Sequence, residues 1–386
     1  KDVRVMNMSY LGGEWYIDEM KTRANEAAGV PFTLPRSKYW YRNDYVPVYE
    51  RVNRPVEARE AIEFFASDDQ RTKVQLSDGS SSDYLPSKTL MLPVDKQNVL
   101  RSGIVAEKDK DLIVDTVYIK LSGDYLNKGE LMIVDMLSNY DWTRPIYLTQ
   151  PYIFQKFGLV DYLQFDGYAY RFVPILTPYR QAGEVGRIDP EYAVPLLLDV
   201  FRYGNLDDEK VYSDYFTQYN LSAARAREAF ARVAKELIRR GDEKPNFPAT
   251  NRELAIRLLD EGMRRMPPAQ VRYTSNNTLP FIEAYYAAGA ADKGDALMLD
   301  YARNLMEYVD YYFQFDGWQY DSITDALDEK LDLLGNLYSM AGYLKRDAVL
   351  TELNAYYRSL GVTEEELIQP DSAHLDYEVS DTAAVN

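Results

Sequence analysis

The sequence contains no cysteine, and its one histidine is His374. The absence of cysteine excludes disulfides, thiolate nucleophiles and zinc fingers, and a lone histidine leaves little room for a histidine-based triad. His374 lies in an acidic, aperiodic stretch after Gln369, so we expect neither a metal nor a catalytic role for it. Any chemistry would therefore depend on carboxylates, hydroxyl groups or bound ions.

Long apolar runs and positive charge are also scarce. A helix that spans a bilayer needs roughly 18 apolar residues, whereas the best run, residues 193–200, already contains Pro195 and Asp199. The sequence has 44 Lys and Arg against 61 Asp and Glu, a formal net charge of −17. This balance argues against nucleic acid or an anionic membrane surface as the main partner.

The sequence opens at Lys1, with no secretory leader before a strand-like run, so we expect a piece of a longer protein.

The residues that are abundant indicate a folded, acidic protein. The hydrophobic content of 46% excludes general disorder, and 34 tyrosines with 14 Phe and 4 Trp supply large side chains for burial. At about 100–200 residues per domain, a chain of 386 residues predicts two or three domains.

The first part of the chain, residues 1–185, mixes the periodicities of strands and helices. This mixture predicts an α/β domain with a mixed sheet and flanking helices. We expect helices over residues 14–26, 55–66 and 128–139, and strands over residues 3–8, 73–76, 89–92, 117–121, 145–149 and 168–175.

The pattern changes between Pro178 and Pro190, and residues 190–361 have helical period almost throughout. Apolar stripes predict four helices, and the segments 250–253 and 322–325 resemble capping boxes at two helix starts. Gly241, Gly289 and Gly342 each follow a helix and precede another, so we predict a tetratricopeptide-like (TPR-like) array of three helical hairpins. Residues 362–386 are predicted to form an acidic, mobile tail.

Two local patterns suggest a binding site, but each is better explained as an ordinary turn or loop. Gly12 and Gly13 stand between a predicted strand and helix, where backbone N–H groups could meet an anion, but no phosphate-binding motif surrounds them. An ordinary tight turn is favoured. Asp78 and Asp83 flank a serine-rich loop, but the spacing and the closing Glu of an EF-hand are missing, which favours a solvated hairpin loop. We expect no metal site and no cofactor.

A Gln-Phe-Asp-Gly segment flanked by aromatics occurs twice. Aromatic faces stack on sugar rings, and amides or carboxylates bond sugar hydroxyls, so the two copies supply the candidate binding residues. The alternative is chance combined with the turn preference of Asp-Gly, and it is favoured because the two contexts differ. No pair of carboxylates can be singled out as a glycosidase acid and base, and no catalytic residue is assigned. The candidates are Gln164, Asp166, Tyr168, Gln314, Asp316 and Trp318.

Several segments of residues 1–175 resemble one family, beginning with Asp2-Val-Arg-Val5 and including Trp142-Thr-Arg-Pro-Ile-Tyr147. They look like the soluble C-terminal region of a large bacterial polytopic membrane-protein family of unknown function, itself similar to GT-C-type protein O-mannosyltransferases. The segments that carry this resemblance are 2–11, 14–18, 84–88, 92–95, 128–137, 142–147, 158–163 and 170–174.

The resemblance implies a non-catalytic extracytoplasmic region of a membrane-embedded glycosyltransferase that moves a lipid-linked sugar to a protein acceptor. Its partners would be the transmembrane half of the same protein and an acceptor or assembly partner on the helical repeats, at the periplasmic face of the inner membrane. The family's acidic Gly-Asp-Asn-Asp segment lies upstream of this sequence, as would the strand and helix that complete the first βαβ unit. We therefore expect a sheet edge near residues 3–8 that is either bare or covered by a neighbour. Two alternatives stay open, a free-standing periplasmic TPR-like adaptor and a carboxylate-based glycoside hydrolase.

Overall fold

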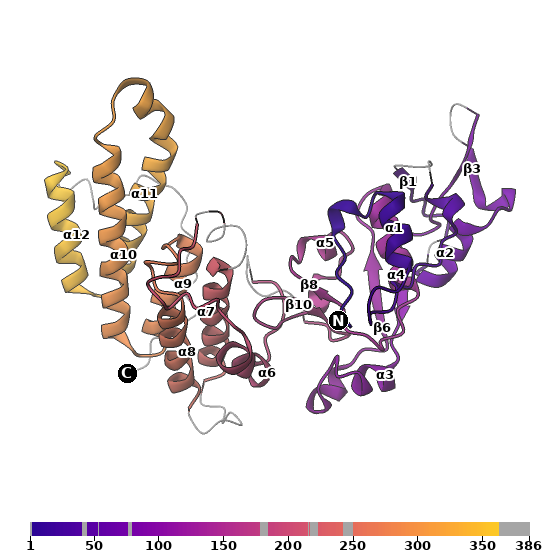
Figure 1. The fold of residues 1–386 in the computed structure, drawn as a ribbon, viewed down its shortest axis with the longest axis horizontal. Coiled ribbons are helices and arrows are strands. Elements are labelled where there is room, and N and C mark those ends of the chain that lie inside the picture. Colours follow the sequence, from indigo (N-terminus) through magenta and orange to yellow (C-terminus); the bar gives the residue numbers. More distant parts are fainter. Residues whose placement is uncertain are drawn as a thin grey trace. The chain divides into compact units, whose positions relative to one another are not determined.

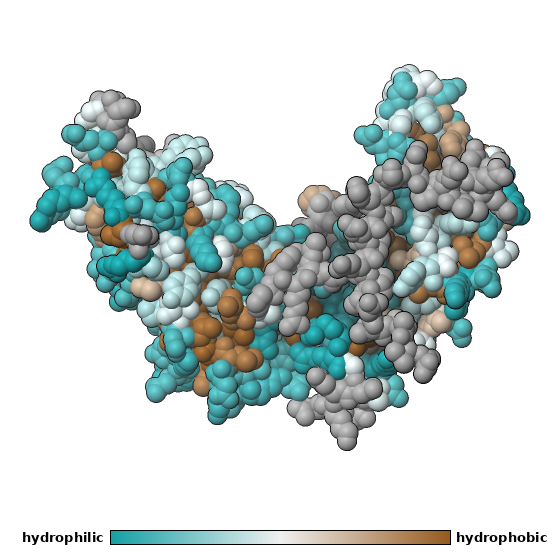
Figure 2. All heavy atoms as spheres, turned by 180° about the vertical axis from the view of Figure 1, so that it is seen from behind, coloured by the Kyte–Doolittle hydropathy of each residue, from teal (hydrophilic) through white to brown (hydrophobic). Residues whose placement is uncertain are grey.

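The computed structural model describes residues 2–40, 45–52, 54–75, 79–177, 184–214, 216, 223–241 and 250–362. The chain divides into two compact units, Lys1–Asp189 and Pro190–Asn386. The first contains small sheets and helices, and the second is built from helices packed on one another, as predicted (Figure 1). Among the residues coloured in Figure 2, hydrophilic ones predominate and apolar ones gather in patches.

The N-terminal unit combines five short α-helices with ten short strands in its described part. The helices are α1 (Glu14–Lys21), α2 (Ala58–Ala66), α3 (Lys96–Arg101), α4 (Lys128–Ser138) and α5 (Tyr152–Gln155). The strands are β1 (Tyr45–Pro47), β2 (Val56–Glu57), β3 (Lys73–Gln75), β4 (Ser81–Asp83), β5 (Thr89–Pro93), β6 (Thr116–Lys120), β7 (Tyr125–Asn127), β8 (Tyr147–Leu148), β9 (Leu163–Phe165) and β10 (Tyr170–Phe172).

These strands form small sheets instead of one broad sheet. The central one has the order β2-β5-β6, in which β2 is parallel to β5 and β6 is antiparallel to it, with Leu90 opposite Ile119. A second has the order β8-β10-β9, and β1-β7 and β3-β4 are antiparallel pairs. The central sheet is thus mixed, as expected, because β2 and β5 are parallel whereas β5 and β6 are antiparallel.

Helix α4 lies in the centre of this unit's core. Nearly all of its side chains are buried, including Leu131, Val134 and Leu137, and it packs against α2. The helix begins with a capping box in which the Asn127 side chain accepts from the Glu130 N–H and the Glu130 carboxylate accepts from the Asn127 N–H, both at 2.9 Å. Burial on every side explains why the sequence of this helix is apolar almost throughout.

Three predictions for this unit are corrected. Residues 3–8 form no strand within the described residues, because residues 3–6 form no backbone hydrogen bond, the Asn7 N–H donates to the Tyr16 hydroxyl at 2.6 Å and Met8 begins a 3-10 helix. Val3 and Val5 are exposed by 74% and 78%. The helix expected over 14–26 ends at Lys21, where Thr22 turns away and bonds the Glu19 carbonyl. The serine-rich loop contains β4, whose polar residues pair with β3.

The C-terminal unit contains seven α-helices and a π-helical turn in its described part. They are α6 (Pro190–Pro195), the π turn η6 (Leu196–Val200), α7 (Ala223–Arg239), α8 (Asn251–Arg265), α9 (Ser275–Ala287), α10 (Ala291–Tyr312), α11 (Gly317–Tyr343) and α12 (Asp347–Ser359). Helix α7 packs against both α8 and α9, and each later helix packs against the one before it. The predicted apolar stripes supply the core, with Phe230, Leu258, Leu305 and Leu334 all nearly inaccessible to solvent.

The predicted helix ends are partly confirmed. Gly289 follows α9 with a φ of 82°, and the Ala290 N–H bonds the Tyr285 carbonyl across it at 2.9 Å, which is a Schellman motif. Gly342 lies inside α11, and the left-handed residue is Lys345, with a φ of 55°. Likewise the segment 322–325 lies inside α11, which begins after Asp316.

No helix among the described residues has both the length and the apolar character needed to cross a membrane. Some predictions fall outside the described residues: Asp78, the change of pattern at residues 178–183 and the tail beyond residue 362.

Candidate functional site

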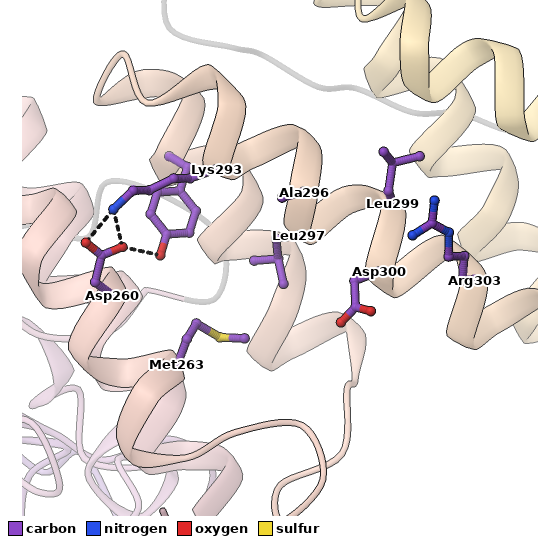
Figure 3. A pocket seen from close by; sticks show the side chains of 9 residues that line it. Asp260, Met263, Lys293, Ala296, Leu297, Leu299, Asp300 and Arg303 are labelled. Carbon is purple, nitrogen blue, oxygen red and sulfur yellow. Dashed lines mark hydrogen bonds and ion pairs between the residues drawn. The ribbon is translucent and has the colours of Figure 1, made fainter.

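The best candidate for a binding surface is an open groove in the helical unit, formed by α8, α9 and α10 (Figure 3). Its volume is about 680 Å³, within the usual range for ligand sites. Helix α10 supplies most of the lining through side chains spaced three or four residues apart, which places them on one helical face. The lining residues are Asp260, Met263, Tyr285, Lys293, Ala296, Leu297, Leu299, Asp300 and Arg303.

A charged cluster marks one end of the groove. The Lys293 ammonium donates to both carboxylate oxygens of Asp260, at 2.5 and 2.7 Å, and the Tyr285 hydroxyl donates to the same carboxylate at 3.0 Å. Burial, together with the nearby Asp260 charge, raises the pKa of Tyr285. Asp260 therefore links three helices, and Tyr285 stays a neutral donor at physiological pH.

The other end of the groove carries Asp300 and Arg303, as Figure 3 shows. Asp300 accepts a hydrogen bond from the Tyr273 hydroxyl at 2.5 Å. Arg303 donates two bonds, of 2.6 and 2.8 Å, to the Glu352 carboxylate on α12. The bond from Arg303 lowers the pKa of Glu352. This bidentate pair fixes the guanidinium at the rim of the groove.

Between these ends the groove is apolar. Met263 and Leu297 lie between the two charged ends in Figure 3, with Ala296 beside them. An apolar floor with charged ends suits binding, since apolar contact supplies affinity and the charges fix orientation. Among the described residues no group of three or more Asp, Glu or His could hold a metal ion.

The first Gln-Phe-Asp-Gly segment is buried in the β9–β10 hairpin. Gln164 and Asp166 are 5% and 4% exposed, and the Gln164 amide donates to the Asp166 carboxylate at 2.9 Å. Arg171 lies 3.0 Å from the other oxygen of Asp166. Burial raises the pKa of half-buried Tyr168 to about 12. The polar groups of Gln164 and Asp166 are used within the fold.

The second copy lies at the turn between α10 and α11 and is exposed. Gln314 donates to the Asp310 carbonyl at 3.3 Å, and Asp316 is the N-cap residue of α11 without a side-chain capping bond. Trp318 is 77% exposed. The two copies therefore lie in different units, one inside a hairpin and one on a surface.

The Gly12–Gly13 pair and the serine-rich loop that ends at Asp83 are the other two candidate sites, and each has a structural explanation. Gly13 is the N-cap of α1, and Gly12 lines a smaller pocket with Lys128, whose ammonium bonds Glu14 at 2.7 Å. Asp83 lies against the ammonium groups of Lys38 and Lys73, so a buried ion-pair cluster takes the place of a cation site.

A comparison with protein families applies to the first unit. Residues 1–192 match the family model TMEM260-associated domain 2. This match is consistent with a domain of a TMEM260-like membrane family, in line with the expected membrane-protein relationship, and the relationship to GT-C enzymes stays a prediction. No curated protein and no solved structure matches the chain. The groove lies outside the TMEM260-associated region, in α8, α9 and α10.

Sequence reasoning missed the groove as a site. Lys293, Ala296, Asp300 and Arg303 follow one another at intervals of 3, 4 and 3 residues, beside the buried stripe that begins at Leu297. This spacing marks an amphipathic helix, but ordinary solvent-exposed faces look the same. Only the packing of α8 and α9 against α10 makes this face one wall of a groove.

Proposed function

We propose that this chain is a non-catalytic, extracytoplasmic region of a membrane-embedded glycosyltransferase that transfers a lipid-linked sugar to a protein acceptor. In this proposal the helical unit binds the acceptor protein or an assembly partner through the groove between α8 and α10. The match of residues 1–192 to a TMEM260-associated domain supports the membrane-protein setting. The single observation that carries the binding role is the groove, with its apolar floor and its charged ends.

The groove suits a polypeptide segment better than a small polar molecule. Its floor would receive an apolar side chain, while Lys293 and Arg303 lie at opposite ends, each beside its own carboxylate. A peptide can contact both ends at once, because it is extended and carries charges of its own. The carboxylates of the groove are already engaged by Lys293 and Tyr273, which favours binding over acid–base chemistry.

The test compares two matched substitutions in the full-length membrane protein. Ala296 is exposed in the groove and Ala348 is exposed on α12, so Ala296→Trp fills the groove and Ala348→Trp adds the same side chain elsewhere. We expect Ala296→Trp to raise the KM for the acceptor about tenfold with an unchanged kcat, because about 1.4 kcal/mol of binding is lost. Ala348→Trp should leave both constants unchanged.

A second arm tests the absence of catalysis. The isolated chain, mixed with lipid-linked sugar and acceptor, should give no transfer, and measurable turnover would refute the non-catalytic role. An unchanged KM in Ala296→Trp would remove the groove from acceptor binding. A full-length gene with a signal peptide and no upstream hydrophobic spans would instead support the periplasmic adaptor, for which the packed helical array is the favourable observation.

A further inference from the structure

The turn that joins α10 to α11 exposes an unusual number of aromatic rings. We call residues 308–320 the aromatic tip. It lies at one end of the helical unit, beyond the ends of α9 and α12 in the view of Figure 1. Its aromatic residues are Tyr308, Tyr311, Tyr312, Phe313, Phe315, Trp318 and Tyr320.

These rings lie outside the core of the unit. Tyr311, Phe313 and Trp318 are 53%, 48% and 77% exposed, whereas Val309, on the other side of the same turn of α10, is fully buried. The rings of Tyr311 and Phe315 meet edge to face, with centroids 5.2 Å apart. Exposed aromatic side chains that gather in one place are typical of an interaction surface.

The aromatic tip is also acidic and lacks a positive charge. Residues 304–328 contain no Lys or Arg but six exposed carboxylates, those of Glu307, Asp310, Asp316, Asp321, Asp325 and Asp328. Within the described part of the chain, none of the six forms an ion pair. The Asp310 carboxylate accepts a hydrogen bond from the Tyr356 hydroxyl at 2.9 Å. Other carboxylates of this unit do form ion pairs, as in the Arg303–Glu352 and Arg346–Asp295 pairs.

We propose that the aromatic tip binds a cationic polypeptide segment rich in Arg or Lys. A guanidinium or ammonium group over an aromatic face gains a cation–π interaction, and the six unpaired carboxylates attract the same charge. An anionic membrane surface fits poorly, because these carboxylates would be repelled by it. A sugar would stack on the rings but gain nothing from a net charge of this sign. This surface is separate from the groove and does not depend on the proposed function.

The test uses the whole 386-residue chain and a fluorescent ten-residue peptide of alternating Arg and Gly, with an alternating Gln and Gly peptide for comparison. We expect the Arg peptide to bind and the Gln peptide to bind at least tenfold more weakly. Trp318→Ala should weaken binding of the Arg peptide about tenfold. The double variant Asp316→Asn, Asp321→Asn should do the same and reduce the dependence of binding on salt. Asp316 makes no side-chain capping bond, so α11 should be unaffected.

Matched controls lie farther along α11. Tyr343 is 69% exposed near the C-terminal end of that helix, and Asp332 is exposed in its middle. Tyr343→Ala and Asp332→Asn should leave the affinity unchanged, as should Ala296→Trp in the groove. Equal loss in Tyr343→Ala and Trp318→Ala, or equal affinity for the two peptides, would overturn the proposal. So would Trp318-dependent binding of phosphatidylcholine vesicles that exceeds binding of the Arg peptide.

Discussion

Among the described residues of the helical unit, the most deeply buried charge is the guanidinium of Arg227 on α7, which has no exposed surface. It donates to the carbonyls of Met266 and Val271, each at 2.5 Å, and lies 3.4 Å from the Asn277 side-chain oxygen. Burial lowers the pKa of Arg227 to about 10. This one side chain connects α7 to the loop after α8 and to the start of α9.

Replacing Arg227 tests how much this connection stabilises the unit. Arg227→Met fills similar space but leaves two buried carbonyls without a donor, and each such loss costs about 1–3 kcal/mol. We therefore expect the free energy of unfolding to fall by about 2–4 kcal/mol, measured by urea denaturation. Arg252→Met, at an exposed position on α8, should change it by less than about 0.5 kcal/mol. Equal effects of the two substitutions would show that the connection contributes nothing.

At the level of elements, α8 supplies two hydrogen bonds to the π turn η6. Arg265 donates to the carbonyls of Leu197 and Leu198 at 3.2 and 2.8 Å. Glu261, one turn earlier on α8, holds the Arg265 guanidinium at 2.9 Å and also bonds Arg264 at 2.8 Å. The bond from Arg264, with the help of Arg265, lowers the pKa of Glu261 to about 2.

This lowered pKa predicts a pH dependence. Glu261 stabilises the folded state when it is ionised, so its contribution is complete above the unfolded pKa of about 4.3. The contribution is lost as the pH falls from about 4.3 towards 2. We expect the stability difference between the native chain and Glu261→Gln to shrink over this window, as measured by urea denaturation at a series of pH values. A difference that stays constant with pH would contradict the assignment.

The long helices could be predicted from the sequence and the short strands could not. Helices such as α8 and α10 carry several turns of apolar period and, for α8, a capping box between Thr250 and Glu253, so local information suffices. Strand β4 is polar and three residues long, and its place depends on Lys38 and Lys73, which are close to Asp83 only after folding. Residues 3–8 show the opposite case, a strand-like pattern without a neighbouring strand to pair with.

Of the candidate binding residues, too, some could be predicted from the sequence and others become apparent only in the fold. The exposed aromatic segment around Trp318 could be found from sequence because it is one continuous stretch. The groove could not, since Asp260, Tyr285 and Lys293 come from three helices and meet only through packing. The buried state of Gln164 and Asp166 also depends on a partner, Arg171, that sequence similarity between the two segments does not reveal.

At the scale of the whole molecule, the two units have separate cores. The cluster around α4 extends from Leu11 to Ile175 and, as far as the structure describes the chain, is built from residues of the N-terminal unit. We expect two calorimetric transitions, because each core can be lost without the other. Arg227→Met should lower the midpoint of only one of them. A single transition that moves as a whole in this variant would indicate that the two units unfold together.

The unpaired run at residues 3–8 has a consequence for how copies of the chain behave in solution. Val3 and Val5 are exposed, and within the described residues the backbone groups of residues 3–6 form no hydrogen bond, so a second chain could pair with this extended stretch as a strand. The net charge of −17 opposes this by keeping molecules apart. Because salt shortens the range of that repulsion to about 8 Å at physiological ionic strength, colloidal stability should be greatest in dilute buffer and fall as salt is added.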